Sequence, residues 1–319
     1  MPFVHAQQVS PRIAYIYPSG GQQGTSFQVE VAGVYLDGVA NALVSGSGVQ
    51  ATVIEHIKPL SVEEANLLMS KMEGLLEKKK QAAQPLASSK WTTNDEKELA
   101  KLRERFSTFI PKAQVNPAIV ERVTLQITIA SGAELGERDL RLRTPLGLTN
   151  PRAFCVGQFP EFSRKPARTY RQPKDSRGPV VPPPEGEIAV TLPATVNGQI
   201  MPGAADRFRF KARQGQRLVC ALSARKLIPF LSDTVPGWFQ AELSLLDARG
   251  RELARAERYS FDPDPMLYFV VPKDGEYVVE IKDGLYRGRE DFVYRVTLAE
   301  LPVVTSIFPL GGPVGAQTT

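Results

Sequence analysis

The sequence predicts a mainly β protein with two β-sandwich domains and an αα-hairpin inserted into the first of them. Apolar and polar residues alternate over much of the chain, for example around Phe208 and Phe210, which is the period of a strand with one buried face. Between about residues 60 and 112 the apolar spacing changes to three and four, the period of a helix. Residues 159–187 are rich in proline and lack periodicity, so we expect a semi-rigid linker between the sandwiches.

The first domain is expected to cover residues 9–158, with strands in residues 11–58 and again from Val123 onward. The order Tyr17-Pro18-Ser19-Gly20-Gly21, then Gly24-Thr25 and an alternating strand that ends at Ala32-Gly33, resembles immunoglobulin-like domains of the IPT/TIG type. The resemblance implies an immunoglobulin-like sandwich of the kind that serves as an interaction module in extracellular bacterial proteins.

Two capped amphipathic helices are predicted inside this domain. Residues 61–64 (Ser-x-x-Glu) and 93–96 (Thr-x-x-Glu) each have the pattern of a capping box, in which two side chains satisfy the first amides of a helix. Pro85 and Pro111 are expected to end the helices. The apolar stripes consist of Leu68, Met72, Leu75 and Leu76, and of Leu99, Leu102, Phe106 and Phe109. Two interpretations stay open: a solvated hairpin whose stripes pack together, and a helix face that binds a partner.

The second domain is expected at residues 188–300. Turn residues such as Gln214-Gly215, Arg249-Gly250 and Asp274-Gly275 separate its strands, as an antiparallel sandwich requires. The order of strands and turns between Val196 and Leu298 resembles the bacterial pre-peptidase C-terminal (PPC) domain. That resemblance implies a jelly-roll-like β-sandwich that is appended to secreted proteins and has no catalytic activity of its own.

Composition and charge argue against several classes of protein. Of the 319 residues, 42% are hydrophobic and 23% charged, as in an ordinary soluble globular protein. The net charge of +5 arises from scattered Lys and Arg without interleaved aromatic residues, so nucleic-acid binding is not expected. No apolar run reaches the roughly 20 residues of a transmembrane helix.

The N-terminus favours export. Residues 1–8 are interpreted either as the remnant of a signal peptide or as a disordered start, and Val4-His5-Ala6 has small residues at the positions that a signal peptidase recognises. Together with the PPC resemblance, this predicts a secreted, periplasmic or cell-surface location. Cys155 and Cys220 are expected to be buried apolar side chains in separate domains, with a disulfide as the alternative.

Catalysis is not predicted. Nucleophilic catalysis commonly needs a histidine beside Ser or Cys, and the two histidines are His5, in the expected signal remnant, and His56, near the hairpin. The two Cys and two His never occur in the close pairs of a zinc site. We therefore predict no enzyme and no cofactor, apart from a candidate calcium ion.

Asp262 and Asp264 are the candidate metal ligands. Ca²⁺ takes about six to eight oxygen ligands, which loops supply from carboxylates and carbonyls. The PPC resemblance makes calcium a candidate ion, because relatives of that domain include calcium-dependent collagen-binding modules; Asp206 or Asp283 would be additional ligands. The calcium-dependent relatives have an acid-rich N-terminal linker, and residues 181–187 of this chain are poor in acidic residues by comparison. The alternative is a purely structural loop.

Trp238, Tyr259 and Tyr286 are candidate ligand-binding residues. Each lies near turn residues, where an aromatic ring can be exposed and stack on a sugar or a peptide. The ligand would be an extracellular polysaccharide or protein. The alternative is that the rings are half-buried in the sandwich. Tyr268 and Val270 alternate along a strand and are expected in the core instead.

Residues 302–315 repeat residues 11–24 without a gap, with Phe308-Pro309 in place of Tyr17-Pro18. Residues 301–319 are therefore expected to begin a second IPT/TIG-like unit, and neighbouring domains of a longer chain are expected partners. The predicted function is an exported, non-catalytic module for binding, adhesion or spacing. The alternative is an accessory region of a larger secreted peptidase or glycosidase whose catalytic domain lies outside this chain.

Overall fold

The computed structural model describes residues 10–82, 90–106, 118–167, 186–228, 239–257, 262–304, 308–309 and 311–315. The chain divides into two compact units. The first unit comprises Met1–Ile16 and Gly24–Phe154, and the second comprises Tyr17–Gln23 and Cys155–Thr319. Both are built from β-sheets, which confirms the predicted mainly β fold class.

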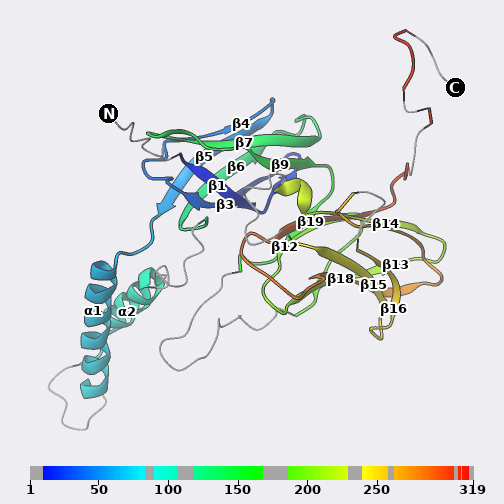
Figure 1. The fold of residues 1–319 in the computed structure, drawn as a ribbon. Coiled ribbons are helices and arrows are strands. Elements are labelled where there is room, and N and C mark those ends of the chain that lie inside the picture. Colours follow the sequence, from blue (N-terminus) through cyan, green and yellow to red (C-terminus); the bar gives the residue numbers. More distant parts are fainter. Residues whose placement is uncertain are drawn as a thin grey trace. The chain divides into compact units, whose positions relative to one another are not determined.

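Two four-stranded sheets contain the strands of the first unit, together with two short segments counted with the second unit, Gly20–Gln22 and residues 155–157 (Figure 1). One sheet has the order β1-β3-β6-β5, from Arg12–Tyr17, Ser26–Val34, Glu121–Ile129 and Val49–Ile57. The other has the order β2-β9-β7-β4, from Gly20–Gln22, Arg152–Gly157, Gly136–Thr144 and Asn41–Val44, and β8 (Gly147–Leu148) pairs with β7. Apolar side chains from both sheets are buried, including Val31, Leu125, Leu140, Leu142 and Phe154. Their alternation in the sequence is thus explained by one buried face on each sheet.

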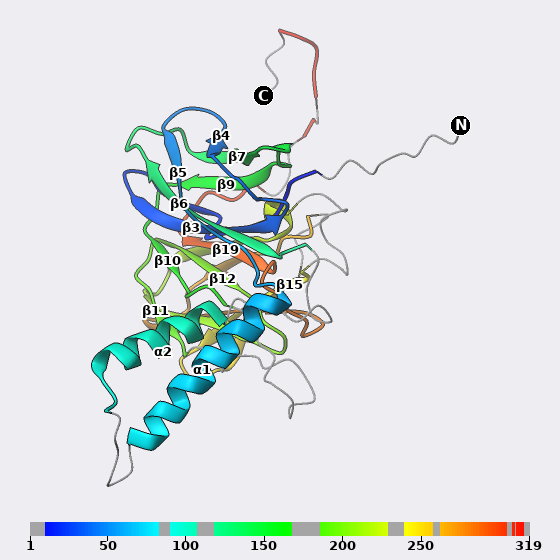
Figure 2. The same ribbon diagram turned by 90° about the vertical axis from the view of Figure 1, so that its left-hand side faces the viewer.

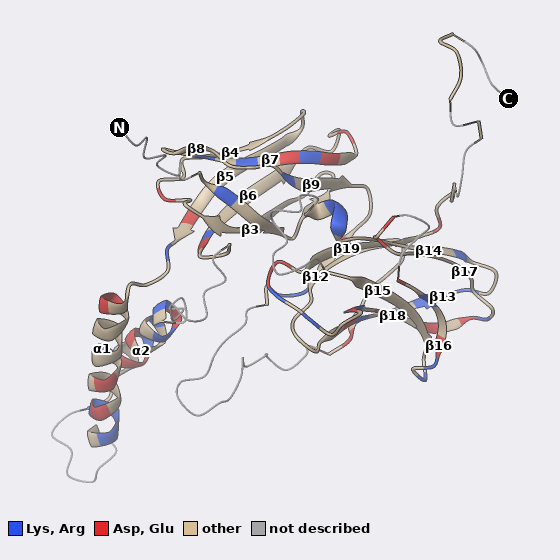
Figure 3. Ribbon diagram, in the orientation of Figure 1, with Lys and Arg blue, Asp and Glu red and all other residues tan. Residues whose placement is uncertain are grey.

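The helical hairpin is inserted between β5 and β6 (Figure 2). Helices α1 (Val62–Ala82) and α2 (Thr93–Phe106) pack against each other, and Ala65 of α1 and Leu99 of α2 are buried. Leu76, predicted in the apolar stripe of α1, is exposed instead. The insertion leaves the sheet intact because β5 and β6 are antiparallel neighbours, with Ile57 opposite Arg122 at the point where the hairpin departs. Acidic residues lie in the first turn of α1 and basic residues in its last turn, which complements the helix dipole (Figure 3).

One of the two predicted capping boxes is displaced. Ser61 and Glu64 form the first box as predicted: Glu64 N donates to Ser61 Oγ at 3.1 Å, and Ser61 N donates to Glu64 Oε2 at 2.8 Å. The second box is formed by Thr92 and Asp95, one residue before the predicted pair. The reason lies in the packing of the hairpin, since Asp95 also accepts a hydrogen bond from Lys78 of α1. The expected stops at Pro85 and Pro111 lie outside the described residues.

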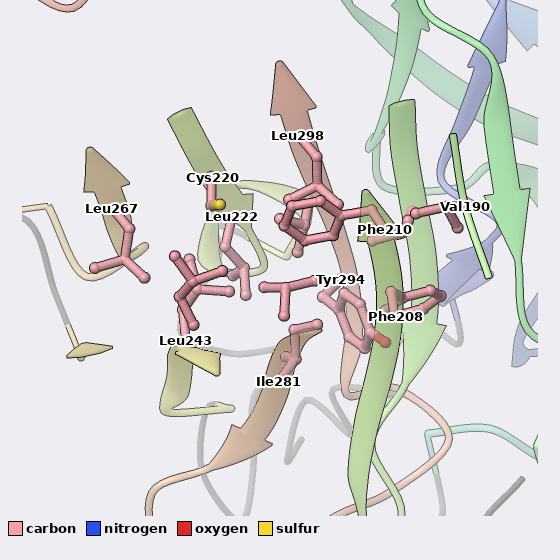
Figure 4. Packing of buried hydrophobic residues seen from close by; sticks show 14 of the residues in the cluster. Val190, Phe208, Phe210, Cys220, Leu222, Leu243, Leu267, Ile281, Tyr294 and Leu298 are labelled. Carbon is pink, nitrogen blue, oxygen red and sulfur yellow. The ribbon is translucent and has the colours of Figure 1, made fainter. Parts of the chain in front are cut away.

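The second unit contains two five-stranded sheets. The first has the order β10-β12-β19-β14-β17, from Glu161–Ser163, Ala194–Gln199, Val293–Ala299, Arg217–Ser223 and Met266–Val270. The second has the order β11-β13-β18-β15-β16, from Ile188–Ala189, Ala205–Ala212, Gly275–Asp283, Ala241–Asp247 and Glu252–Ala256. Side chains from both sheets interdigitate in one core, among them Phe208, Phe210, Leu222, Leu243, Ile281 and Leu298 (Figure 4).

Two details of this unit differ from the sequence-based expectation. Glu161–Ser163 falls in the expected linker, yet it forms β10 and pairs in parallel with β12. Tyr268 and Val270 are about half exposed on the edge strand β17, and Leu267 occupies the core instead. The phase of β17 could not be read from the sequence because residues 266–271 are all apolar. Residues 168–185 of the expected linker lie outside the described residues.

Three further predictions concern the cysteines, the membrane and the C-terminal repeat. Neither Cys155 nor Cys220 forms a disulfide, so the alternative of a bridge between them is wrong. Cys220 is buried as expected, whereas Cys155 is only partly buried. Burial raises the pKa of the Cys220 thiol to about 12. Among the described residues, neither helix is long and apolar enough to span a membrane. In the C-terminal repeat Phe308 and Val314 are exposed, whereas residues 305–307, 310 and 316–319, like residues 1–9, lie outside the described part of the chain.

Candidate ligand-binding loop of the second unit

The loop after β18 is held by a buried carboxylate. Asp283 is fully buried and accepts hydrogen bonds from the backbone amides of Gln240, Leu285 and Arg287, at 2.8–3.0 Å. The guanidinium of Arg287 adds two contacts to the same carboxylate, each at 3.1 Å. Burial alone would raise the pKa of Asp283, but these hydrogen bonds outweigh it and lower the pKa below its ordinary value. The carboxylate therefore stays ionised at neutral pH and fixes the loop.

Tyr286 lies in this loop and is 60% exposed to solvent. Its backbone has a φ of 55°, in the left-handed region that L-residues with bulky side chains rarely adopt. Tyr286 N donates to Asp283 O at 2.9 Å, and Gly203 N donates to Tyr286 O at 3.0 Å. Both sides of the peptide backbone are thus anchored, so the ring is displayed from a preformed turn.

An ion-pair network lies beside the ring. Lys282 Nζ is 5.5 Å from the centroid of the Tyr286 ring and 2.8 Å from Glu242 Oε1. Glu242 Oε2 in turn accepts from Arg255 Nη2 at 2.7 Å. The Glu242 carboxylate is almost fully buried, whereas Arg255 is partly exposed. The contact with the Glu242 carboxylate, through hydrogen bonding and charge, raises the pKa of Lys282 and keeps its ammonium group charged. The exposed ring therefore lies beside a lysine that a buried carboxylate holds in place.

Asp262 and Asp264, the predicted calcium ligands, both accept hydrogen bonds from the protein itself. Asp264 is buried and accepts from the backbone amides of Ala224, Arg225 and Lys226, at 2.7–3.1 Å, at the start of the short 3₁₀-helix Arg225–Leu227. Asp262 accepts from Asp264 N at 3.0 Å and pairs with Lys226 Nζ at 3.0 Å. These contacts support the structural reading of the loop. Within the described residues, no three His, Cys, Asp or Glu side chains are grouped as metal ligands would be.

Asp206 and Asp283, the two additional candidate calcium ligands, also contact protein groups. Asp283 accepts hydrogen bonds from the backbone of the Tyr286 loop. Asp206 accepts from the hydroxyl of Tyr294 at 2.6 Å and lies 2.9 Å from Arg164 Nε. Burial, and secondly the charge of Asp206, raise the pKa of the Tyr294 hydroxyl well above its usual range. Asp206 therefore links Arg164, in the segment after β10, to Tyr294 of β19.

Of the three aromatic residues predicted to bind a ligand, the structure describes one. Tyr286 is exposed as the sequence suggested, whereas Trp238 and Tyr259 lie outside the described residues. Lys282 and Glu242 were missed by sequence reasoning. They are 40 positions apart in the chain and meet because they face each other across the β15–β18 ladder. An alternating strand shows which face a residue is on but not its neighbour on the next strand.

Comparisons with known proteins give distant similarities. The chain matches no protein-family model and no curated protein. Among solved structures, it is similar to the pre-peptidase C-terminal domain of collagenase from Bacillus anthracis, with 14% identity, 37% of this chain and 98% of that chain covered, and a TM-score of 0.26. It is also similar to the periplasmic lysozyme inhibitor PliG of Aeromonas hydrophila, with 12% identity, coverage of 35% and 99%, and a TM-score of 0.22.

A third similarity extends over more of the chain. The glucan-utilisation protein SGBP-B of Bacteroides ovatus, solved with a mixed-linkage heptasaccharide, has 9% identity, coverage of 88% and 71%, and a TM-score of 0.19. TM-scores this low carry no inference about function. The resemblance of the first unit to IPT/TIG domains stays a prediction.

Proposed function

We propose that this chain is an exported, non-catalytic module that binds an extracellular ligand through the Tyr286 loop of its second unit. The observation that supports the proposal is an exposed tyrosine held in a left-handed turn by a buried carboxylate. An aromatic ring that is fixed before binding loses little conformational entropy when it contacts a ligand.

The stability of the fold does not account for tyrosine at position 286. A left-handed backbone costs an ordinary L-residue roughly 1–2 kcal/mol, and glycine avoids that cost. Burial of Tyr286 offsets little of this cost, because the residue is 60% exposed. Residues held in a strained backbone conformation cluster at active sites, ligand clamps and switch regions. Glycine could form the same turn without this cost, so the presence of an exposed aromatic ring at position 286 favours a role in ligand binding.

The proposal is tested with the full chain and four immobilised probes: cellulose, insoluble chitin, peptidoglycan sacculi and gelatin. We expect at least one probe to retain the protein and Tyr286→Gly to weaken retention by about tenfold or more, as for an anchoring aromatic residue. The melting temperature should be unchanged or higher, because glycine relieves the backbone strain.

The matched control is Tyr268→Thr, which removes a ring of similar exposure from the edge strand β17. This variant should bind as the wild type does. Equal binding by Tyr286→Gly and the wild type would refute the proposal.

A further inference from the structure

The first unit displays a second tyrosine in the same way. Tyr35 has a φ of 58° and is 50% exposed. Among the described residues, Tyr35 and Tyr286 are the two non-glycine residues with positive φ. Both are tyrosines, and both direct a large part of the ring into water. Two bulky residues in a conformation that disfavours them indicate that the two turns have a common use.

The Tyr35 turn is anchored from both sides. The next residue, Leu36, is fully buried, and its backbone amide donates to Glu121 Oε1 at 3.2 Å. The second oxygen of Glu121 lies 2.8 Å from His56 Nε2, which orients the carboxylate. Val39 N donates to Leu36 O at 3.1 Å and closes the turn. A carboxylate on a neighbouring strand therefore fixes this turn, as Asp283 fixes the turn of Tyr286.

Each turn also has a lysine–carboxylate pair close by in the chain. Two residues after Tyr35, Asp37 Oδ1 lies 2.6 Å from Lys58 Nζ, and both side chains are largely exposed. Four residues before Tyr286, Lys282 pairs with Glu242, whose carboxylate is buried and contacts Arg255 as well. Near Tyr35 the lysine can supply donors and the carboxylate acceptors, whereas near Tyr286 the lysine alone can supply donors. A hydroxyl group can use both, because it donates and accepts at once.

These features together fit a sugar ring better than a protein surface. The CH face of a pyranose stacks on an aromatic ring, while its hydroxyls bond to charged side chains nearby. A protein partner would require a large continuous contact with a well-packed apolar centre. We infer that Tyr35 is a second ligand-contacting residue and that both tyrosines bind one class of ligand, a hydroxyl-rich polysaccharide. The inference rests on the proposed function for its first contact, Tyr286.

A polysaccharide offers many equivalent sugars, so each tyrosine can contact the same ligand through its own unit. The experiment measures binding isotherms of the full chain on cellulose, insoluble chitin and peptidoglycan sacculi, with gelatin as a protein probe. The variants are Tyr35→Gly, Tyr35→Asn, Tyr286→Gly and the double variant Tyr35→Gly with Tyr286→Gly. Leu43→Thr, at an exposed apolar residue of the first unit, is the control.

We expect Tyr35→Gly to weaken retention on a polysaccharide by about tenfold, and the double variant to abolish it. Leu43→Thr should bind as the wild type. Asparagine tolerates the left-handed conformation, so Tyr35→Asn should keep the fold and lose binding to the same extent. That variant separates a lost contact from a damaged turn.

Two results would overturn the inference, and each differs from a failure of the proposed function. Wild-type binding by both Tyr35 variants, with weakened binding by Tyr286→Gly, would remove Tyr35 from the site and leave the proposed function intact. Retention on gelatin and on no polysaccharide would refute the ligand class. Unchanged binding by Tyr286→Gly would refute the proposed function itself.

Discussion

Arg295 and Glu161 form a bidentate ion pair inside the second unit. Arg295 Nη2 lies 2.6 Å from Glu161 Oε1, and Arg295 Nη1 lies 2.9 Å from Glu161 Oε2. Both side chains are nearly buried, at 8% and 11% exposure. Asn197 bonds to both partners. Gly20 packs against Arg295 so closely that a Cβ atom there would collide with the guanidinium. The pair joins β10 to β12 and β19.

Removing one member of this pair should destabilise the second unit. Glu161→Ala leaves Arg295 buried without its counter-ion, and breaking a buried pair in this way costs about 3–5 kcal/mol. Glu187→Ala is the control, because Glu187 pairs with Arg209 where both are about one-third exposed, and such pairs contribute at most about 1 kcal/mol. Chemical denaturation of the full chain measures both free energies of unfolding. Equal losses would show that burial does not distinguish the two pairs.

Calcium should leave the thermal stability unchanged. The carboxylates of Asp262 and Asp264 already accept backbone amides, and Asp264 is buried. An ion at 100 times its dissociation constant would add about 2.7 kcal/mol, which a melting curve detects readily. Asp264→Ala should lower the melting temperature with or without calcium, since buried amides of the 3₁₀-helix lose their acceptor, at a cost of about 1–3 kcal/mol. A calcium-dependent rise that Asp262→Ala with Asp264→Ala abolishes would establish a metal site.

The helical hairpin should be dispensable for folding of the first unit. Replacing residues 59–117 by a short Gly-Ser turn joins β5 to β6, and these strands already lie side by side with Ile57 opposite Arg122. A hairpin loop at this position closes without disturbing the ladder. Circular dichroism should show a cooperative thermal transition with a reduced helical signal. Loss of that transition would mean that the hairpin protects the core of the sandwich.

The hairpin should lose helix in acid through Asp95. Hydrogen bonds from Lys78 and Thr92 lower the pKa of Asp95 to about 2, from an ordinary value of 3.8. Because the folded pKa lies below the unfolded one, ionised Asp95 stabilises the hairpin fully above pH 4, and that contribution is lost as the pH falls from about 4 towards 2. Helical ellipticity of the wild type should fall over this range. Asp95→Asn should show a weaker dependence, and Glu98→Gln, at an exposed position of α2, should match the wild type.

Limited trypsin digestion should cut first within residues 168–185, where the composition predicts a linker with sites such as Arg171, Lys174 and Arg177. Arg164 lies only four residues before this region but is buried behind β10, so the bond after it should be protected. Mass spectrometry of the first fragments locates the cuts. Early cleavage after Arg164 would contradict the assignment of β10 to the sandwich, and early cleavage within residues 196–298 would contradict the predicted linker boundary.

The sequence by itself determined the fold class, most strands and the first capping box. These features depend on neighbours in the chain: the alternation at Phe208 and Phe210 selects one buried face, and Ser61 and Glu64 are three residues apart. Tertiary structure decided the rest. Lys78 selects Asp95 as a capping partner, and Arg295 draws Glu161 into a strand from a distance of 134 residues.

The candidate site shows the same division. The position of Tyr286 near turn residues suggested an exposed ring, but its left-handed backbone, the Asp283 anchor and the Lys282–Glu242 pair were visible only after folding. Local periodicity records which side of a strand is buried, because burial acts on each residue separately. Hydrogen bonds and ion pairs between strands depend on register and on which strands become neighbours, and those are properties of the whole fold.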